Sequence, residues 1–287
     1  MPRHLVFRFD VDTHRCLSRG TPSLRDLADE FDVRFTFFVN MGRAVSRHRT
    51  LLAAGQHLFS KRAVEQPVQH LSSLRKLGAA DTIRVIAGNP MVGAAQTAEL
   101  KRLRDAGHEI GLHGGRNHRQ WQDYARRWDQ ATVSAELAWG LAVLRRVIDV
   151  PVGFASPAWQ QPDGLGVAAR EAGIAYLADE HGNDTDGVNV TQGIPSVATN
   201  ILGEPGGVGF LEWHRARRSD DETILRDFAH RLDRITNIAV MYDHPFWAGV
   251  EDLAMTAKLL REAQSQGVEV VTLRQAVDVA ISNETVG

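Results

Sequence analysis

Short apolar runs alternate with longer amphipathic stretches along most of the 287-residue chain. The short runs are rich in β-branched and aromatic residues, which is typical of β-strands. They lie at 4–10, 33–39, 82–88, 108–113, 152–156, 174–178, 237–243 and 268–273. Stretches with helical spacing of apolar residues lie between them, at 22–31, 97–107, 131–148, 221–235 and 250–267. This alternation predicts an α/β fold with a parallel sheet.

The pattern fits a closed α/β barrel and an open doubly wound sheet equally well. The chain shows no internal repeat, low-complexity tract or linker-like change of composition. We therefore expect a single domain that spans residues 1–287.

Residues 43–80 stand apart from the alternating pattern. They contain seven Lys and Arg residues and a single acid, Glu65, interleaved with leucine, valine and phenylalanine. A basic amphipathic insertion of this kind suits an anionic lipid surface or a phosphate-bearing substrate. A solvated helical excursion that only covers the fold is the alternative.

Composition narrows the class of protein only modestly. The chain is 43% hydrophobic and 24% charged with a net charge of −2, which is ordinary for a globular protein and gives no reason to expect nucleic acid. The single cysteine, Cys16, excludes an intrachain disulfide framework and fits a reducing compartment. The N-terminal residues lack the apolar core of a signal peptide, and no apolar run reaches about 18 residues. We therefore expect a cytoplasmic protein.

The first motif with chemical potential is FDVDT at 9–13, which closes the first predicted strand. Because side chains alternate along a strand, Asp10 and Asp12 should project from the same face. One carboxylate at such a strand end can bind a metal ion while the other accepts a proton from water. A helix cap followed by a turn aspartate is the alternative interpretation.

The second motif is GHEIGLHGGRNH at 107–118, where a predicted strand leads into a glycine-rich loop between His113 and His118. Neutral imidazoles are suitable ligands for zinc and related ions, and the glycines let the loop bring both rings together. Two unrelated polar loop histidines are the alternative. His108 lies at the other end of the strand, and we assign no function to it.

A third candidate, His244, follows the predicted strand at 237–243, where it could donate a proton to a leaving amine. A buried, hydrogen-bonded histidine is the alternative. Asp179 follows the strand at 174–178 and is a candidate for the carboxylate that orients His244, or else for a turn or capping aspartate. A barrel would bring all these strand ends together, and one carboxylate with two imidazoles leaves coordination positions open for water and substrate.

These motifs, in this order and spacing, resemble the polysaccharide deacetylase superfamily over essentially the whole chain. The resemblance implies a distorted parallel (β/α) barrel and a divalent metal, usually zinc. By position it implies Asp12, His113 and His118 as the metal ligands. It also implies Asp10 as the general base and His244 as the general acid in the hydrolysis of an N-acyl amide on a sugar.

Further segments resemble one branch of that superfamily, the lipid-linked formamido-arabinose deformylases and related amino-sugar deacetylases. They are FFVNMGR (37–43), IAGNPMVG (86–93), Trp121–Gln122 and IPSV (194–197). The branch implies an N-acylated sugar on a polyprenyl phosphate and peripheral contact with the inner face of the cell membrane. A soluble deacetylase of N-acyl sugars, and a barrel that only binds sugar or lipid after losing catalysis, are the alternatives.

Three positions depart from the family pattern. The second histidine usually comes one residue earlier, at the position of Asn117, so either the loop has one inserted residue and His118 is the ligand, or Asn117 takes the ligand position. We prefer the insertion because Trp121 is displaced by the same single residue. The arginine that usually braces the base corresponds to Ala155. HPFWAG at 244–249 lacks the acidic residues that follow the late histidine in the deformylase, so the acyl group and the sugar stay open.

Overall fold

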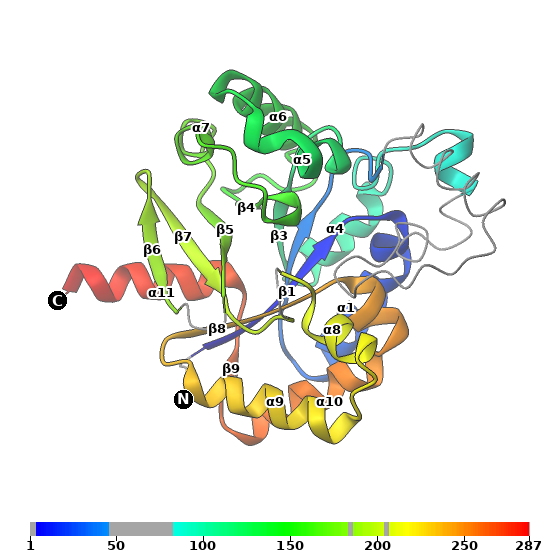
Figure 1. The fold of residues 1–287 in the computed structure, drawn as a ribbon, viewed down its shortest axis with the longest axis vertical. Coiled ribbons are helices and arrows are strands. Elements are labelled where there is room, and N and C mark those ends of the chain that lie inside the picture. Colours follow the sequence, from blue (N-terminus) through cyan, green and yellow to red (C-terminus); the bar gives the residue numbers. More distant parts are fainter. Residues whose placement is uncertain (1–3, 46–82, 183–185, 204–206, 287) are drawn as a thin grey trace.

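The structure is a computed structural model that describes residues 4–45, 83–182, 186–203 and 207–286 (Figure 1). The basic insertion at 43–80 lies, after its first three residues, outside the described residues. Its contact with lipid therefore stays a prediction.

Within the described residues the strands form one curled sheet. They are β1 (His4–Val11), β2 (Thr36–Val39), β3 (Glu109–His113), β4 (Gly153–Ala155), β5 (Tyr176–His181), β6 (Val188–Thr191), β7 (Ile194–Thr199), β8 (Ile238–Asp243) and β9 (Glu269–Val270). Their order is β6-β7-β5-β4-β3-β2-β1-β8, with β9 paired to the start of β1.

All neighbouring strands run parallel except β6 and β7, which form an antiparallel hairpin. An isolated parallel bridge between Ile201, just after β7, and Met241 of β8 brings the two sides of the curled sheet together. The distorted parallel barrel that the family resemblance implies is therefore confirmed.

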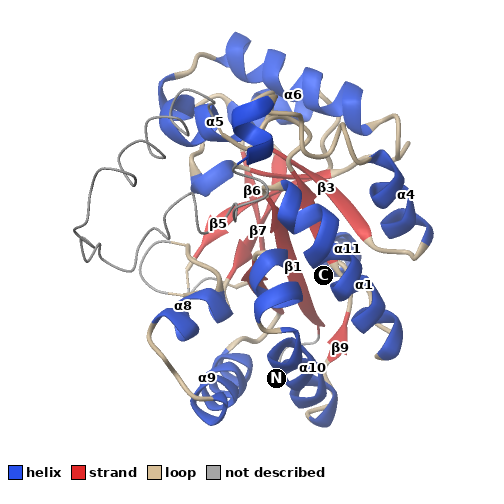
Figure 2. Cartoon of the chain, turned by 90° about the vertical axis from the view of Figure 1, so that its right-hand side faces the viewer, coloured by secondary structure: helices blue, strands red, loops and turns tan. Residues whose placement is uncertain are grey.

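Helices surround the strands, as Figures 1 and 2 show. They are α1 (Thr21–Glu30), α4 (Thr97–Asp105), α5 (His118–Tyr124), α6 (Gln130–Leu144), α7 (Leu165–Glu171), α8 (Phe210–Ala216), α9 (Asp221–Arg234), α10 (Leu253–Ser265) and α11 (Leu273–Val286). Shorter helical turns are η1 (Cys16–Gly20), η2 (Ala125–Arg127), η3 (Pro157–Trp159) and η4 (Trp247–Glu251). No helix in the described part of the chain has the length and hydropathy needed to cross a bilayer.

Side chains alternate between two environments along β1. The odd-numbered residues pack against the helices in the main hydrophobic cluster, whereas Val6 belongs to a second cluster inside the barrel. Arg8, Asp10 and Asp12 have the same parity as Val6, so they follow it in a row along the inner face. The barrel interior therefore changes from apolar at the start of β1 to charged at its C-terminal end. The candidate residues lie at this end of the barrel.

The structure corrects two predicted strands. Residues 83–87 are helical, and within them only Val85 is buried, so the β-branched run at 82–88 has no strand-like buried face. The predicted strand at 268–273 is reduced to Glu269–Val270, because Leu273 already begins α11. The backbone N–H of Leu273 donates to Thr36 Oγ1 (2.8 Å), which fixes this helix start beside β2.

His108, to which the sequence assigned no function, has a structural role. It is 5% exposed, its Nδ1 accepts a hydrogen bond from the Phe35 backbone N–H (3.1 Å), and its ring stacks on Phe35. Burial, with Arg34 nearby, lowers the pKa of His108 to about 4. The ring is therefore neutral in the folded protein at neutral pH.

We expect His108 to make the fold sensitive to mild acid. Its folded pKa is lowered, so the unfolded chain takes up the proton first, and stability is lost as pH falls from about 6.5 toward 4. Between pH 8 and pH 5 this loss should be about 2 kcal/mol. His108→Asn is the comparison, because its amide oxygen can accept the same hydrogen bond but does not titrate. Urea unfolding at both pH values should show that the free energy of unfolding falls between pH 8 and pH 5 by about 2 kcal/mol less in this variant than in the wild type. An equal acid loss in both proteins would contradict this account.

Candidate active site

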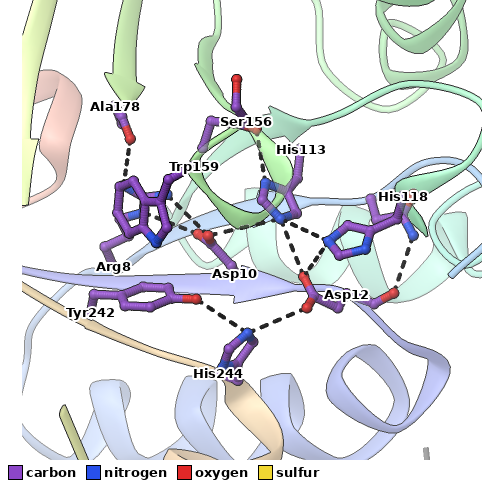
Figure 3. A network of polar contacts seen from close by, with 12 residues as sticks. Arg8, Asp10, Asp12, His113, His118, Ser156, Trp159, Ala178, Tyr242 and His244 are labelled. Carbon is purple, nitrogen blue, oxygen red and sulfur yellow. Dashed lines mark hydrogen bonds and ion pairs between the residues drawn. The ribbon is translucent and has the colours of Figure 1, made fainter. Parts of the chain in front are cut away.

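The candidate residues converge where the strands end (Figure 3). Asp10 lies in β1 and Asp12 directly follows it, His113 is the last residue of β3, and His244 directly follows β8. His118 is the first residue of α5. All five side chains are buried, with at most 7% of any residue exposed. The shared edge of the parallel strands thus forms a single polar site, as the barrel architecture requires.

Asp12, His113 and His118 bring three electron-pair donors to one point. Asp12 Oδ1 lies 3.2 Å from His113 Nε2 and 3.1 Å from His118 Nε2, and the two nitrogens are 3.2 Å apart. His113 Nδ1 lies 2.8 Å from the Ala155 carbonyl oxygen, so Nδ1 carries the proton and Nε2 of the neutral ring presents a lone pair. Apart from these two imidazole nitrogens, buried Asp12 Oδ1 has no polar partner among the described residues. This donor set fits a divalent ion such as Zn²⁺.

Asn117 has a different function from His118. It is the N-cap of α5, and its side-chain oxygen accepts a hydrogen bond from the Gln120 backbone N–H (3.1 Å). The His118 ring, one residue later, faces Asp12 and His113. The structure therefore agrees with a one-residue insertion in the loop, and it does not bring Asn117 into the site.

Gly114 allows the chain to turn sharply after His113. Its φ is +71°, and a Cβ at this position would lie 2.6 Å from Cγ of Pro157. Both the left-handed backbone and the close approach favour glycine. The turn lets α5 start close to the end of β3, so that the two histidine rings meet.

Electrostatics favour a positive charge in this cluster. Burial opposes the charge on Asp12, but the imidazoles around it, His118 first among them, outweigh burial and hold the pKa of Asp12 well below its ordinary value. Burial likewise opposes a charge on His113, but the nearby carboxylates of Asp10 and Asp12 raise the pKa of His113. Protons and a divalent ion would therefore compete for the same nitrogens.

Asp10 lies beside this cluster and belongs to an ion pair. Its Oδ2 is 3.8 Å from His113 Nε2. Arg8 donates from Nε to Asp10 Oδ1 and from Nη2 to Asp10 Oδ2, both at 3.0 Å. The sequence left the support of this carboxylate open, and the structure assigns it to Arg8.

His244 lies on the other side of the cluster. Its Nε2 is 3.3 Å from Asp12 Oδ2 and 3.2 Å from the Tyr242 hydroxyl, and its Nδ1 is 3.1 Å from Glu212 Oε2. Glu212, on α8, is thus the carboxylate that orients the ring. The predicted pairing of Asp179 with His244 is therefore corrected.

Asp179 instead supports the turn after β4. Its two carboxylate oxygens accept from the Ser156 backbone N–H (2.5 Å) and the Ser156 hydroxyl (2.9 Å). Burial raises the pKa of Asp179 to about 6, although the Ser156 hydrogen bonds oppose the rise. This turn leads into Ala158 and Trp159, whose φ values of 51° and 57° are unusual for residues other than glycine. Asp179 therefore acts on the wall of the site and not on His244.

Asp243 holds Glu212 in place. Its Oδ2 accepts from the backbone N–H groups of Leu211 (2.6 Å) and Glu212 (3.4 Å), and its Oδ1 accepts from the His244 N–H (2.8 Å). Glu212, Asp243 and His244 could by distance also form a group of metal ligands. The Asp243 oxygens are occupied by backbone donors, so we interpret this group as the support of His244.

Gly20 allows the segments that follow β1 and β8 to meet. A Cβ at Gly20 would lie 2.2 Å from the Pro245 carbonyl oxygen, which directly follows His244 in sequence. Only glycine fits such an approach without a shift of the backbone. The close packing fixes the loop after Asp12 against the loop that carries His244.

A cavity of about 550 Å³ opens onto the candidate residues. Its walls include Trp159, Tyr242 and Glu212 together with the polar side chains of Arg119 and Gln122. Its size and mixed lining are suitable for a small polar molecule such as a monosaccharide unit.

Three important residues were absent from the sequence-based site. Arg8 could have been found, because in FRFD it shares the inward parity of Asp10. Tyr242 has the same relation to His244. Glu212 gave no signal, since its proximity depends on how α8 packs against β8.

The fold and the strand-end site together define an α/β barrel with a three-donor cluster flanked by a carboxylate and an imidazole. The polysaccharide deacetylase family model matches residues 2–177, more than half of the chain. The protein belongs to the polysaccharide deacetylase family.

A relative from Shewanella sediminis is described as a 4-deoxy-4-formamido-L-arabinose-phosphoundecaprenol deformylase. It is 29% identical over 182 residues, which is 61% of this chain and 56% of the relative. The match thus covers little more than half the length of that relative.

Solved structures share the fold. A polysaccharide deacetylase from Mycobacterium smegmatis is 18% identical with a TM-score of 0.64, covering 98% of this chain and 91% of that one. A family 4 carbohydrate esterase from Streptomyces lividans, solved with acetate, is 13% identical with a TM-score of 0.52, covering 93% and 91%. A family 4 pseudoenzyme from Bacillus anthracis is 12% identical with a TM-score of 0.55, covering 96% and 66%. At these identities the similarity establishes the fold alone.

The corrected partner of His244 leads to a testable prediction. Glu212→Gln should lower kcat about 10–100-fold, because an amide can still bond the ring but cannot stabilise its positive charge. Steady-state kinetics with metal content measured in parallel should show this loss at unchanged metal occupancy. Asp179→Asn should have the smaller effect, and a larger loss in Asp179→Asn than in Glu212→Gln would restore the original assignment.

Proposed function

We propose that this protein hydrolyses an N-acyl amide on a sugar, with a divalent metal held by Asp12, His113 and His118. One observation carries the proposal. A carboxylate oxygen of Asp10, 3.8 Å from His113 Nε2, and the His244 Nε2, 3.3 Å from Asp12 Oδ2, flank the three-donor cluster in the same cavity. A base and an acid on either side of a metal site are what amide hydrolysis needs.

When bound, the ion, Zn²⁺ by its ligand preference, would supply Lewis-acid polarisation and a water of lowered pKa. Asp10 accepts a proton from the attacking water as the new C–O bond forms. His244, with Nδ1 held by Glu212, donates from Nε2 to the sugar nitrogen as the C–N bond breaks. The products are a carboxylic acid and a free amino sugar. The buried positions of these residues keep bulk water away from the proton transfers.

For the substrate, we propose a formamido or acetamido sugar carried on a polyprenyl phosphate. The function described for the Shewanella sediminis relative supports the lipid-linked sugar. The basic composition of residues 43–80 supports an anionic partner. A soluble N-acyl-sugar deacetylase, in which the basic segment only covers the barrel, is the second candidate. HPFWAG at 244–249, which lacks the deformylase's acidic residues, leaves the acyl group and the sugar open.

A substrate panel tests the activity. Metal-loaded protein should be incubated with N-formyl and N-acetyl amino sugars, each free and linked to a short polyprenyl phosphate. Proton NMR should show formate or acetate appearing in equal amount to free amine. The His244→Gln protein is the control for background hydrolysis. If sugars bind but no acid appears from any amide, the protein is a binding barrel and the proposal fails.

Vesicle cosedimentation tests the membrane association. The protein should pellet with phosphatidylglycerol vesicles at low salt and be released at about 0.5 M salt, because screening weakens the attraction between basic residues and an anionic lipid surface. Phosphatidylcholine vesicles and a variant with Lys61, Arg62, Arg75 and Lys76 changed to Gln are the controls. Absence from the pellet at every salt concentration would favour the soluble deacetylase.

A further inference from the structure

Arg8 is a fully enclosed charge that touches the site. Its relative exposure is 0%, and it lies on the inner face of β1 two residues before Asp10. A buried guanidinium needs a balancing charge and a full set of acceptors, or it destabilises the fold. The groups around the Arg8 guanidinium therefore indicate its function.

Hydrogen-bond acceptors and aromatic rings surround the guanidinium. Besides the two bonds to Asp10, Nη1 donates to the Ala178 carbonyl oxygen (2.6 Å) and to Thr199 Oγ1 (2.9 Å). Its carbon lies 4.4 Å from the Trp159 ring centroid, with the rings of Phe38 and Tyr242 at 4.9 and 5.3 Å. These contacts come from four other strands and the turn after β4, so the position of the guanidinium is fixed by the barrel. Figure 3 shows Arg8 with Asp10, Ala178 and Trp159.

Asp10 is fixed in turn by this guanidinium. A bidentate contact sets both the position and the plane of a carboxylate. Both oxygens of Asp10 accept from Arg8, and Oδ2 also faces His113 Nε2 at 3.8 Å. Asp10 Oδ2 thus lies close to both the Arg8 guanidinium and the three-donor cluster.

We infer that Arg8 is the positioning residue of the base, acting through Asp10 from the same strand. The inference rests on the proposed function, in which Asp10 accepts the proton of the attacking water. Ala155, the position where the family's bracing arginine is expected from the sequence, has no side chain that could do this. Arg8 itself is too buried to touch a substrate, and the group that it hydrogen-bonds in the site is Asp10, so its effect on the proton transfer should pass through Asp10.

A double-mutant cycle tests this coupling. Arg8→Met should lower kcat about 10–100-fold with KM changed less than about twofold, because a misplaced base slows chemistry more than binding. Arg8→Lys, with a point charge in place of a fork, should recover part of the loss. In the Asp10→Asn background, Arg8→Met should cost almost nothing further. If its cost there equals its cost in the wild-type background, Arg8 does not act through Asp10 and the inference is overturned.

Arg231 offers a matched control. It also pairs with a carboxylate (Asp227, 3.0 Å), donates to a carbonyl (Leu202, 2.8 Å) and lies over a ring (Phe210, 5.6 Å), but away from Asp10. Any effect of Arg231→Met on kcat should multiply with that of Asp10→Asn. An Arg8 effect that multiplies in the same way would indicate a purely structural role. If Arg8→Met does not fold, Arg8→Lys enters the same cycle, with a smaller loss in the wild-type background and again almost none in the Asp10→Asn background.

A crystal structure of the zinc-loaded Arg8 variant separates this inference from the proposed function. The Asp10 carboxylate should rotate away from His113 in the variant and stay beside it in the wild type. If Asp10 keeps its position without Arg8, the inference is overturned whatever the substrate. If the wild-type protein hydrolyses no amide, the proposed function fails, while the position of Asp10 still decides whether Arg8 fixes it.

Discussion

Asp12→Ala should lose its divalent ion and with it at least about 10³-fold in hydrolytic rate. Asp12 supplies the only carboxylate oxygen within 3.2 Å of both histidine nitrogens among the described residues. Without it, two neutral imidazoles remain, and the chemistry loses a Lewis acid that is worth several kcal/mol. Elemental analysis of the purified variant should show well below 0.1 equivalent of metal where the wild type holds about one.

Asp123→Asn is the matched control for this variant. Asp123 also lines the cavity, but it pairs with Arg119 and lies outside the three-donor cluster. It should keep its metal. A full equivalent of metal in Asp12→Ala would show that the ion binds elsewhere and would overturn the ligand assignment.

Asp10→Asn should keep its metal and lose about 10²–10⁴-fold in kcat, the usual contribution of a positioned base. The amide can still occupy the space beside Arg8 but cannot accept a proton from water. Steady-state kinetics and metal analysis on the same preparation separate the two effects. The pattern of this variant should therefore differ from that of Asp12→Ala in metal content while resembling it in rate.

Two results would contradict the assignment of Asp10. Normal hydrolysis by Asp10→Asn would show that another group takes the proton. Loss of metal in Asp10→Asn would make Asp10 a ligand, and the 3.8 Å between its Oδ2 and His113 Nε2 would then have to shorten on metal binding.

The residues at the strand ends could be predicted because two local rules locate them. Alternation along β1 places Asp10 and Asp12 on one face, and parallel strands bring His113 and His244 to the same edge. His118 needed more than these rules, because the loop between the histidines could have presented Asn117 instead. In the structure the Asn117 side chain caps α5 by accepting from the Gln120 N–H, and the ring of His118 faces Asp12 and His113.

The partners of those residues could not be predicted as easily. Asp179 was chosen because it lies at a strand end, but an edge of a barrel does not specify which neighbours touch. Its carboxylate bonds Ser156, while Glu212 reaches His244 from α8, a helix whose packing is a long-range property. The predicted strand at 82–88 was wrong for another reason. A short β-branched run is ambiguous between strand and helix, and in the helix that forms at 83–87 only Val85 is buried.

The most direct test is a zinc titration of chelator-stripped protein, with acid release from an N-acyl amino sugar measured at each point. The account predicts no hydrolysis without metal, a linear rise to one equivalent of Zn²⁺, and no rise at all in His118→Ala. Full hydrolysis by the stripped protein, or an equal rise in His118→Ala, would contradict it.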